Sequence, residues 1–159
     1  MQEKSITSTY YIYKVEELPE EEQKLVEMAR EATFSSYAPF SNFKVGAVVL
    51  LDDGKTTIKG CNQENVAFTA GICAERSAIF AAGAQHPEIG IKTLCIAARD
   101  IHDNFVKSPI VPCGSCRQAI SQVEKRYGHG IRILLVGRDE IYVFNSIKDL
   151  LPLTFESLE

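Results

Sequence analysis

Residues 43–62 read FKVGAVVLLDDGKTTIKGCN, and this segment predicts a β-hairpin. Two β-favouring runs flank Asp52-Asp53-Gly54, which is a good turn sequence between strands. The hairpin supplies two neighbouring strands of a sheet, and the segments on either side of it indicate what kind of sheet this is.

The segment before the hairpin predicts an amphipathic helix. PEEEQKLVEMAREATFSSY (19–37) opens with acidic residues, which favour a helix N-terminus. Apolar side chains then recur at helical spacing, at Leu25, Met28, Ala29 and Ala32. Such a helix is expected to cover the sheet. Further upstream, YYIYKV (10–15) fits either an edge strand or an ordered arm.

The segments after the hairpin alternate between helical and strand patterns. They predict a helix over 73–84 ended by Gly83 and the later Pro87, a strand over 93–98, a helix that begins after Pro112, a strand over 131–137, and the short pieces IYVFN (141–145) and SIKDLLP (146–152). This order favours an α/β fold with one mixed sheet and helices on its faces.

The size and charge of the chain restrict the classes of function that it can have. The chain has 159 residues, 45% of them hydrophobic, which suits one compact domain. Its formal net charge of -4 argues against nucleic-acid binding, so we expect a small solute as its partner. No apolar run reaches the roughly 20 residues of a membrane helix, and the first ten residues lack a secretion signal. We therefore expect a cytoplasmic protein with no membrane partner.

Three of the five cysteines have the spacing of a zinc site. Cys113 and Cys116 place two sulfurs within one turn, and Cys73 lies at the start of another predicted helix, where free N–H groups stabilise thiolates. By itself the CxxC pair also fits a redox pair or two small apolar residues. A catalytic zinc ion takes three protein ligands and leaves the fourth position for water. Cys61 and Cys95, in predicted strands, are expected to be buried and unreactive.

Glu75 stands two residues after Cys73, from where its carboxylate can stay off the metal and still reach a metal-bound water. Zinc deaminases combine these parts, because a glutamate that is not a ligand moves protons beside the ion. Three thiolates leave net negative charge on the site. Either Arg76 or Arg117 could donate hydrogen bonds to sulfur and offset that charge.

The blocks YAPFSNFKVGAVVL, GCNQEN, CAERSAI, PCGSCRQ and LLPLTF occur in this order between residues 22 and 156. With these blocks the sequence resembles the small homotetrameric cytidine deaminases, and the combination of CAER with PCGSCRQ is highly specific. The resemblance implies the three-layer α/β/α cytidine deaminase fold over residues 19–159, preceded by an arm of uncertain role (1–18). It also implies one Zn2+ per subunit, held by Cys73, Cys113 and Cys116, and Glu75 as the catalytic proton shuttle.

The same resemblance implies the substrate and its contacts. The reaction would be hydrolytic deamination of cytidine and 2'-deoxycytidine with release of ammonia, a step of pyrimidine salvage. Asn62 and Glu64 would bind the ribose hydroxyls, since residues two apart on a strand share a face. Phe43 would pack against the pyrimidine, and Phe155 would reach a neighbouring subunit's site. The remaining implied positions are Ala74 at the substrate and Arg76 beside the metal ligands.

Two positions depart from the family, which often has Tyr at Phe68 and Ser or Thr at Val111. Both bear on the fine substrate preference. Two other interpretations use the same cysteines. A blasticidin S deaminase would keep the metal chemistry, but Asn62 and Glu64 argue for a ribose. A structural zinc module would need a fourth ligand, and no further cysteine or histidine has suitable spacing.

Overall fold

The computed structural model describes residues 1–155, 157 and 158, and a mixed six-stranded sheet runs through its centre. Its strands are β1 (Tyr11–Tyr13), β2 (Lys44–Leu51), β3 (Thr57–Cys61), β4 (Ile91–Arg99), β5 (Arg132–Val136) and β6 (Ile141–Phe144). The strand order is β1-β6-β5-β4-β2-β3. β4 and β5 are parallel, and all other neighbours are antiparallel. The predicted hairpin is therefore present as β2 and β3.

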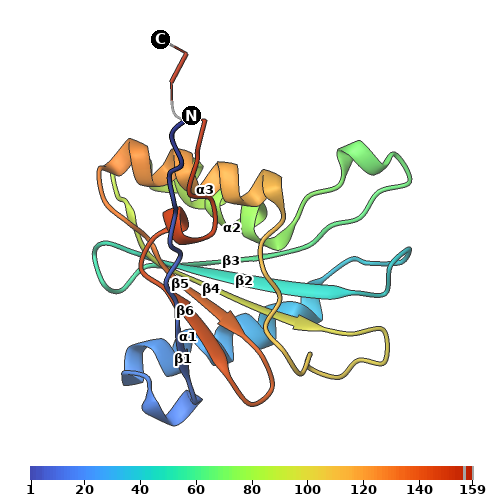
Figure 1. The fold of residues 1–159 in the computed structure, drawn as a ribbon. Helices are drawn as coiled ribbons and strands as arrows, with labels where there is room; N and C mark the ends of the chain where they lie inside the picture. The colour runs from blue at the N-terminus through green and yellow to red at the C-terminus, as the bar shows by residue number, and fades with distance from the viewer. Residues whose placement is uncertain (156, 159) are drawn as a thin grey trace.

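Helices cover both faces of this sheet (Figure 1). α2 (Ala74–Gln85) and α3 (Gly114–Tyr127) lie on one face, and α1 (Glu20–Ala32) lies on the other. The described residues also form short 3-10 turns, η1 (Val15–Glu17), η2 (Thr33–Ser35), η3 (Phe68–Ala70) and η4 (Ile147–Asp149). This is the three-layer α/β/α arrangement predicted above. No described helix combines the length and apolarity needed to cross a membrane.

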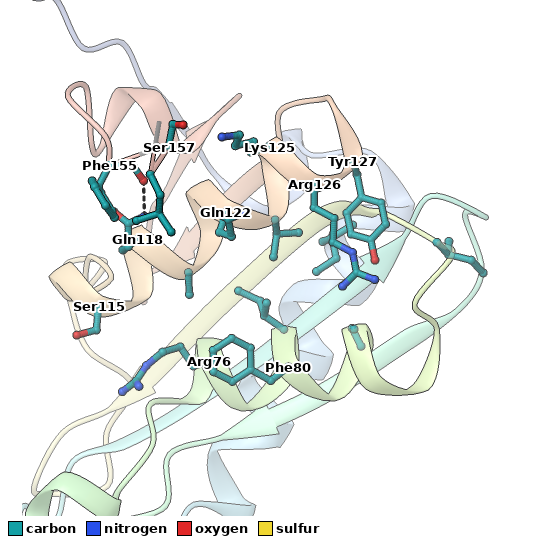
Figure 2. A pocket seen from close by; sticks show the side chains of 18 residues that line it. Arg76, Phe80, Ser115, Gln118, Gln122, Lys125, Arg126, Tyr127, Phe155 and Ser157 are labelled. Carbon is teal, nitrogen blue, oxygen red and sulfur yellow. Dashed lines mark hydrogen bonds between the residues drawn. The ribbon is translucent and has the colours of Figure 1, made fainter.

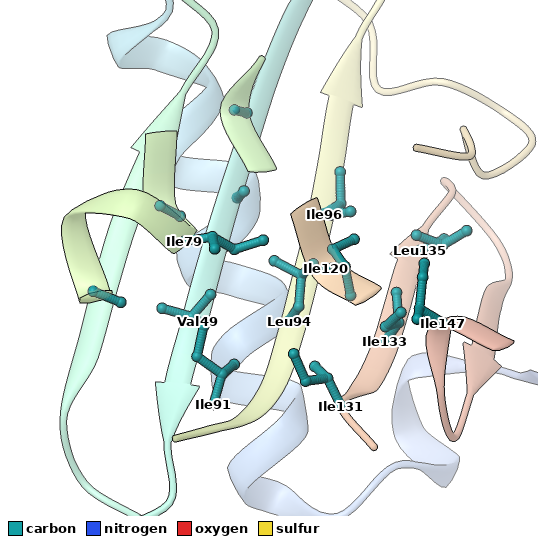
Figure 3. Close-up of a cluster of buried hydrophobic side chains, with 14 of the residues drawn as sticks. Val49, Ile79, Ile91, Leu94, Ile96, Ile120, Ile131, Ile133, Leu135 and Ile147 are labelled. Atoms are coloured by element: carbon teal, nitrogen blue, oxygen red, sulfur yellow. The ribbon is translucent and has the colours of Figure 1, made fainter. Parts of the chain in front are cut away.

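Two apolar clusters hold the layers together, one on each face of the sheet. Figure 3 shows the first, in which Leu94 and Ile96 of β4 pack with Ile79 of α2 and Ile120 of α3. Cys95, between those two strand residues, belongs to the second cluster with the apolar face of α1. Successive strand residues point to opposite faces. β4 is therefore buried on both sides, which explains its almost continuous apolar sequence.

One predicted helix end was wrong, because the helix expected over 19–37 ends at Ala32 and continues only as a 3-10 turn to Ser35. The helix expected over 73–84 ends at Gln85, one residue beyond its predicted end, and Gly83 lies inside it. A glycine inside a helix costs about 1 kcal/mol relative to alanine, and the packing of α2 on the sheet outweighs that cost.

The two cysteines outside the predicted zinc site differ in exposure. Cys95 is fully buried, as expected, and burial raises the pKa of its thiol. Cys61 is only half-buried, contrary to expectation, because it ends β3. Its thiol donates a hydrogen bond to the carbonyl oxygen of Ser35 at 3.2 Å.

The N-terminal segment adds the outermost strand, since β1 pairs with the free edge of β6. The ring of Tyr10 lies 5.1 Å from that of Tyr142 and 5.3 Å from that of Phe144. The backbone N–H of Thr9 donates to Asp149 Oδ1 at 2.9 Å. For YYIYKV the sequence left two alternatives, an edge strand and an ordered arm. The structure shows the edge strand.

Gly60 of β3 lets the start of α2 lie directly on the sheet. A Cβ atom at this position would stand 2.5 Å from the backbone nitrogen of Ala78 and 2.7 Å from the carbonyl oxygen of Ala74. Any larger residue would push this end of the helix outward. Because Cys73 and Glu75 belong to that end, Gly60 sets how closely they approach the sheet.

The buried carboxylate of Glu124 fixes the other end of α3. Its Oε1 accepts the backbone N–H groups of Ile131 and Ile147, both at 2.8 Å, and its Oε2 accepts the hydroxyl of Ser146 at 2.7 Å. A buried carboxylate with this many donors is well compensated. It joins α3 to the start of β5 and to η4.

A histidine and an aspartate connect two turns at the edge of the fold. His129 Nε2 lies 2.8 Å from Asp52 Oδ2, and its Nδ1 lies 3.1 Å from the carbonyl oxygen of Gly130. Both acceptors favour the protonated ring, so the Gly130 carbonyl first and Asp52 second raise the pKa of His129. The resulting stabilisation is complete below the unfolded pKa of about 6.5 and is lost as pH rises through the higher folded pKa.

We expect His129→Gln to lower the free energy of unfolding by about 0.5 kcal/mol at acidic pH, a small amount because both partners are 40% exposed. At alkaline pH the loss should vanish, since the wild-type ring is then neutral. Urea unfolding of both proteins on either side of neutrality measures this difference. An equal loss at both pH values would contradict the ion pair.

Candidate metal centre and substrate pocket

Three sulfur atoms converge where α2 and α3 begin. Cys73 is the N-cap residue of α2, Cys113 is the N-cap residue of α3, and Cys116 lies in the first turn of α3. Their Sγ atoms all lie within 4.8 Å of one another, and those of Cys73 and Cys113 are 3.9 Å apart. The predicted meeting of two helix N-termini at one cluster is therefore observed.

The cluster fits a tetrahedral zinc ion. Zinc–sulfur bonds of about 2.3 Å place ligand sulfurs about 3.8 Å apart, close to the distance between Cys73 and Cys113. Cys116 is fully buried, and burial, with the negative charges of Glu75 and Cys73, raises the pKa of its thiol. A thiolate at that position therefore needs a cation beside it. Among the described residues no fourth ligand joins the group, which leaves one coordination position open.

Arg76 supplies positive charge to the sulfurs. Its Nη2 donates to Cys73 Sγ at 3.6 Å. Hydrogen bonds to Cys73 and then to Cys116 raise the pKa of the guanidinium. A cation that donates to thiolates reduces the negative charge of the cluster.

Arg117, the other arginine considered from the sequence, makes different contacts. Its Nε donates to the carbonyl oxygen of Pro112 at 2.8 Å, and its Nη1 donates to that of Leu150 at 2.7 Å. These two bonds tie the loop that carries Cys113 to the segment after η4. Arg117 thus braces the loop, while Arg76 faces the sulfurs.

Glu75 lies in the first turn of α2 and is 5% exposed. Burial raises the pKa of its carboxyl, opposed by hydrogen bonding to its own backbone N–H and to Cys116 and by the charge of Arg76. Its carboxylate is not among the atoms that form the three-sulfur group. A buried carboxyl beside a candidate metal site, with a raised pKa, is suited to taking up and releasing protons.

A cavity of about 530 Å³ opens beside the cluster. Its walls include Asn62 and Glu64 together with Cys73 and Arg76, so two predicted sugar contacts share a cavity with a predicted metal ligand. The pair does not lie on β3, which ends one residue earlier. Isolated bridges at Gln63 continue the strand pairing through this stretch.

The amide of Asn62 is largely occupied by internal hydrogen bonds. Its Oδ1 accepts the backbone N–H of Val45 at 2.8 Å and the hydroxyl of Ser36, and its Nδ2 donates to the carbonyl oxygen of Phe43 at 2.9 Å. An amide makes about four such bonds. One N–H therefore remains for a ligand, and Asn62 also holds the cavity wall together.

The other predicted substrate contacts lie in different surroundings. Phe43 is half-buried against the first apolar cluster, and the side chain of Ala74 is fully buried within it. Ala74 can therefore meet a ligand only through its backbone N–H, one of the free donors at the start of α2. Phe155 does not line this cavity and is 66% exposed, and its carbonyl oxygen accepts from Gln118 Nε2 at 2.8 Å.

Phe155 instead lines a larger groove between α2, α3 and the C-terminal segment (Figure 2). The groove has a volume of about 1050 Å³ and carries the exposed ring of Phe80 on one side. Arg76 lines both this groove and the smaller cavity. The two hollows therefore adjoin at the candidate metal centre.

The chain is similar in sequence to known zinc-binding deaminases. The sequence profile of the "cytidine and deoxycytidylate deaminase zinc-binding region" matches residues 19–127. A cytidine deaminase of Mycobacterium tuberculosis is 36% identical over 127 residues, which cover 80% of this chain and 84% of that protein. One from Sporosarcina psychrophila is 38% identical over 100 residues, covering 63% and 68%.

Similarity extends to solved structures. A crystal structure of cytidine deaminase from Burkholderia pseudomallei superposes with a TM-score of 0.71 at 36% sequence identity. The match covers 83% of this chain and 97% of that one. About a sixth of this chain therefore lies outside the match.

Proposed function

This chain belongs to the family of the cytidine and deoxycytidylate deaminase zinc-binding region, and on that premise we propose the reaction it carries out. It is a cytidine deaminase, a hydrolase that converts cytidine and 2'-deoxycytidine to uridine and 2'-deoxyuridine with release of ammonia, as in pyrimidine salvage. The observation that carries this proposal is the open three-sulfur cluster beside the buried carboxyl of Glu75.

Cys73, Cys113 and Cys116 would hold one Zn2+ per subunit. The ion would lower the pKa of a water molecule at the open position so that it attacks at neutral pH. Glu75 takes the two protons of that water one after the other, delivering the first to ring nitrogen 3 and the second to the departing amine. Its buried position keeps these transfers away from bulk solvent. Arg76 offsets the negative charge of the sulfurs.

The cavity of about 530 Å³ would hold the nucleoside. The carboxylate of Glu64 and the remaining N–H of Asn62 are suited to hydroxyl groups of the sugar. Phe43 would face the pyrimidine, and the backbone N–H of Ala74 would complete the base contacts. The shared cavity supports the roles of Asn62 and Glu64. The roles of Phe43 and Ala74 rest on the resemblance of the surrounding motifs.

We further propose a homotetramer in the cytoplasm. The groove along α2 and α3 exposes Phe80 and Phe155, and large exposed apolar side chains around a hollow are typical of subunit interfaces. Because Arg76 lines both the groove and the cavity, a neighbouring subunit seated there would bring its own Phe155 close to this site. A reducing compartment suits the site, since it keeps ligand thiols from forming disulfides.

An ammonia-release assay on cytidine tests the function directly. We expect turnover of cytidine and 2'-deoxycytidine, loss of turnover after a strong chelator, and recovery on addition of zinc. Zinc bound without ammonia release from any nucleoside would contradict the proposal and favour a structural site. Blasticidin S in the same assay separates the other deaminase class, and light scattering on the same preparation tests for four 17.7 kDa subunits.

A further inference from the structure

We propose that Ser41 is a positioning residue for the sugar, because its hydroxyl orients the carboxylate of Glu64 toward a ribose hydroxyl. The inference rests on the proposed function, in which Glu64 binds the sugar. Ser41 lies within the block YAPFSNFKVGAVVL (37–50), but neither the spacing nor the resemblance assigned it a role.

Three donors from one short turn surround the carboxylate of Glu64. The hydroxyl of Ser41 donates to Oε1. The backbone N–H groups of Phe40 and Ser41 donate to Oε2 at 2.8 Å and 3.2 Å. A carboxylate offers about four acceptor positions. One position on Oε1 therefore stays open toward the cavity, next to the Ser41 hydroxyl.

Among these donors, the Ser41 hydroxyl is the one that fixes the orientation of Glu64 Oε1. Both backbone N–H groups bind the same oxygen, and the terminal torsion of a glutamate side chain is broad. Two bonds to Oε2 therefore do not determine where Oε1 points, whereas the Ser41 hydroxyl does. This hydroxyl also has the largest part in lowering the pKa of the Glu64 carboxyl, which keeps it an ionised acceptor.

The turn itself is built to present these groups. The N–H of Asn42 donates to the carbonyl oxygen of Ala38 at 3.0 Å, and Asn42 has a left-handed φ of 55°, which asparagine adopts more readily than most residues. Ser41 Oγ in turn accepts the N–H of Phe43 at 3.0 Å. One hydroxyl thus connects the residue proposed for the sugar with the residue proposed for the base.

The test compares cytidine with 2',3'-dideoxycytidine, which lacks the 2' and 3' hydroxyls of the ribose. Removing a hydrogen bond to a charged group should lower kcat/KM of Ser41→Ala for cytidine by about tenfold to a hundredfold, mainly through KM. The value for the dideoxy substrate should change little, because it makes no bond to Glu64. Ser41→Thr keeps a hydroxyl and should restore most of the loss. Zinc content should stay unchanged.

Thr56→Val is the matched control. In the turn between β2 and β3, Asp53 accepts the hydroxyl of Thr56 at 2.6 Å and the backbone N–H groups of Lys55 and Thr56 at 3.0 Å and 2.9 Å. This copies the arrangement around Glu64 at a place away from the cavity. Removing the Thr56 hydroxyl should leave both substrates unaffected.

Several results would overturn the proposal. Equal losses for both nucleosides in Ser41→Ala would indicate general damage to the turn, and unchanged kinetics with cytidine would show that the hydroxyl is dispensable. A wild-type enzyme that uses both nucleosides equally well would also overturn it, since no sugar contact would then need orientation. Failure of the proposed function looks different, because the wild-type protein would release no ammonia from cytidine.

Discussion

We expect Glu75→Gln to abolish turnover of cytidine while zinc remains bound. Glutamine has the size and shape of glutamate but cannot accept the water proton or carry it to the ring and the amine. General acid and base catalysis contributes about 10² to 10⁴ in rate, and in the proposed mechanism Glu75 serves as both acid and base. We therefore expect kcat to fall by about 10⁴ or more, measured as ammonia release beside metal analysis of the same sample.

Two outcomes would contradict this role for Glu75. Near-normal turnover in Glu75→Gln would exclude the proton shuttle, and loss of zinc would show that the carboxylate is a ligand. Glu88→Gln provides the control, since Glu88 is an exposed glutamate in the turn after α2 and should keep full activity. The second variant Glu75→Ala should also retain zinc, because the three sulfurs form their group without the carboxylate.

We expect Cys113→Ser to remove the metal and the activity together. A neutral hydroxyl is a poor zinc ligand, and two remaining thiolates cannot complete the shell. Changes in outer contacts alone weaken metal binding by about 10- to 100-fold, so loss of a ligand should exceed that. Competition with a chromophoric chelator measures the affinity. The fold should survive, because Cys113 is exposed at the surface end of α3.

Cys61→Ser is the matched control for that experiment. Cys61 is a half-buried cysteine at the end of β3, and its sulfur is not part of the cluster. The variant should keep one zinc per chain and normal turnover. A Cys113→Ser protein that kept a full zinc complement would exclude this cysteine from the ligand set.

Spacing along the sequence explains why the three-sulfur cluster could be predicted. Cys113 and Cys116 share one helical turn whatever the rest of the chain does, and helix starts were indicated at both cysteine blocks. The prediction of helices on the faces of a mixed sheet came from the order of helical and strand patterns in the sequence. These features depend on neighbours in the sequence, which is why they could be inferred before any tertiary contact was known.

Features that depend on distant contacts could not be inferred. Arg76 and Arg117 each follow a ligand closely, and only the position of Leu150 beside α3 shows why Arg117 turns away from the sulfurs. The bond from Ser41 to Glu64 spans 23 residues of sequence, and neither of the blocks that contain these residues shows that the two side chains meet. The single free N–H of Asn62 likewise appears only when its internal partners are known.

The outermost strand has a consequence for the order of biosynthesis. Tyr11 leaves the ribosome early, yet its partner on β6, Val143, is made 132 positions later. At roughly 5 to 20 residues per second this gap lasts roughly 7 to 26 s. During that interval the aromatic segment before Lys14 has no sheet to join. Pairing at this edge must therefore wait for the synthesis of β6, long after β1 has been made.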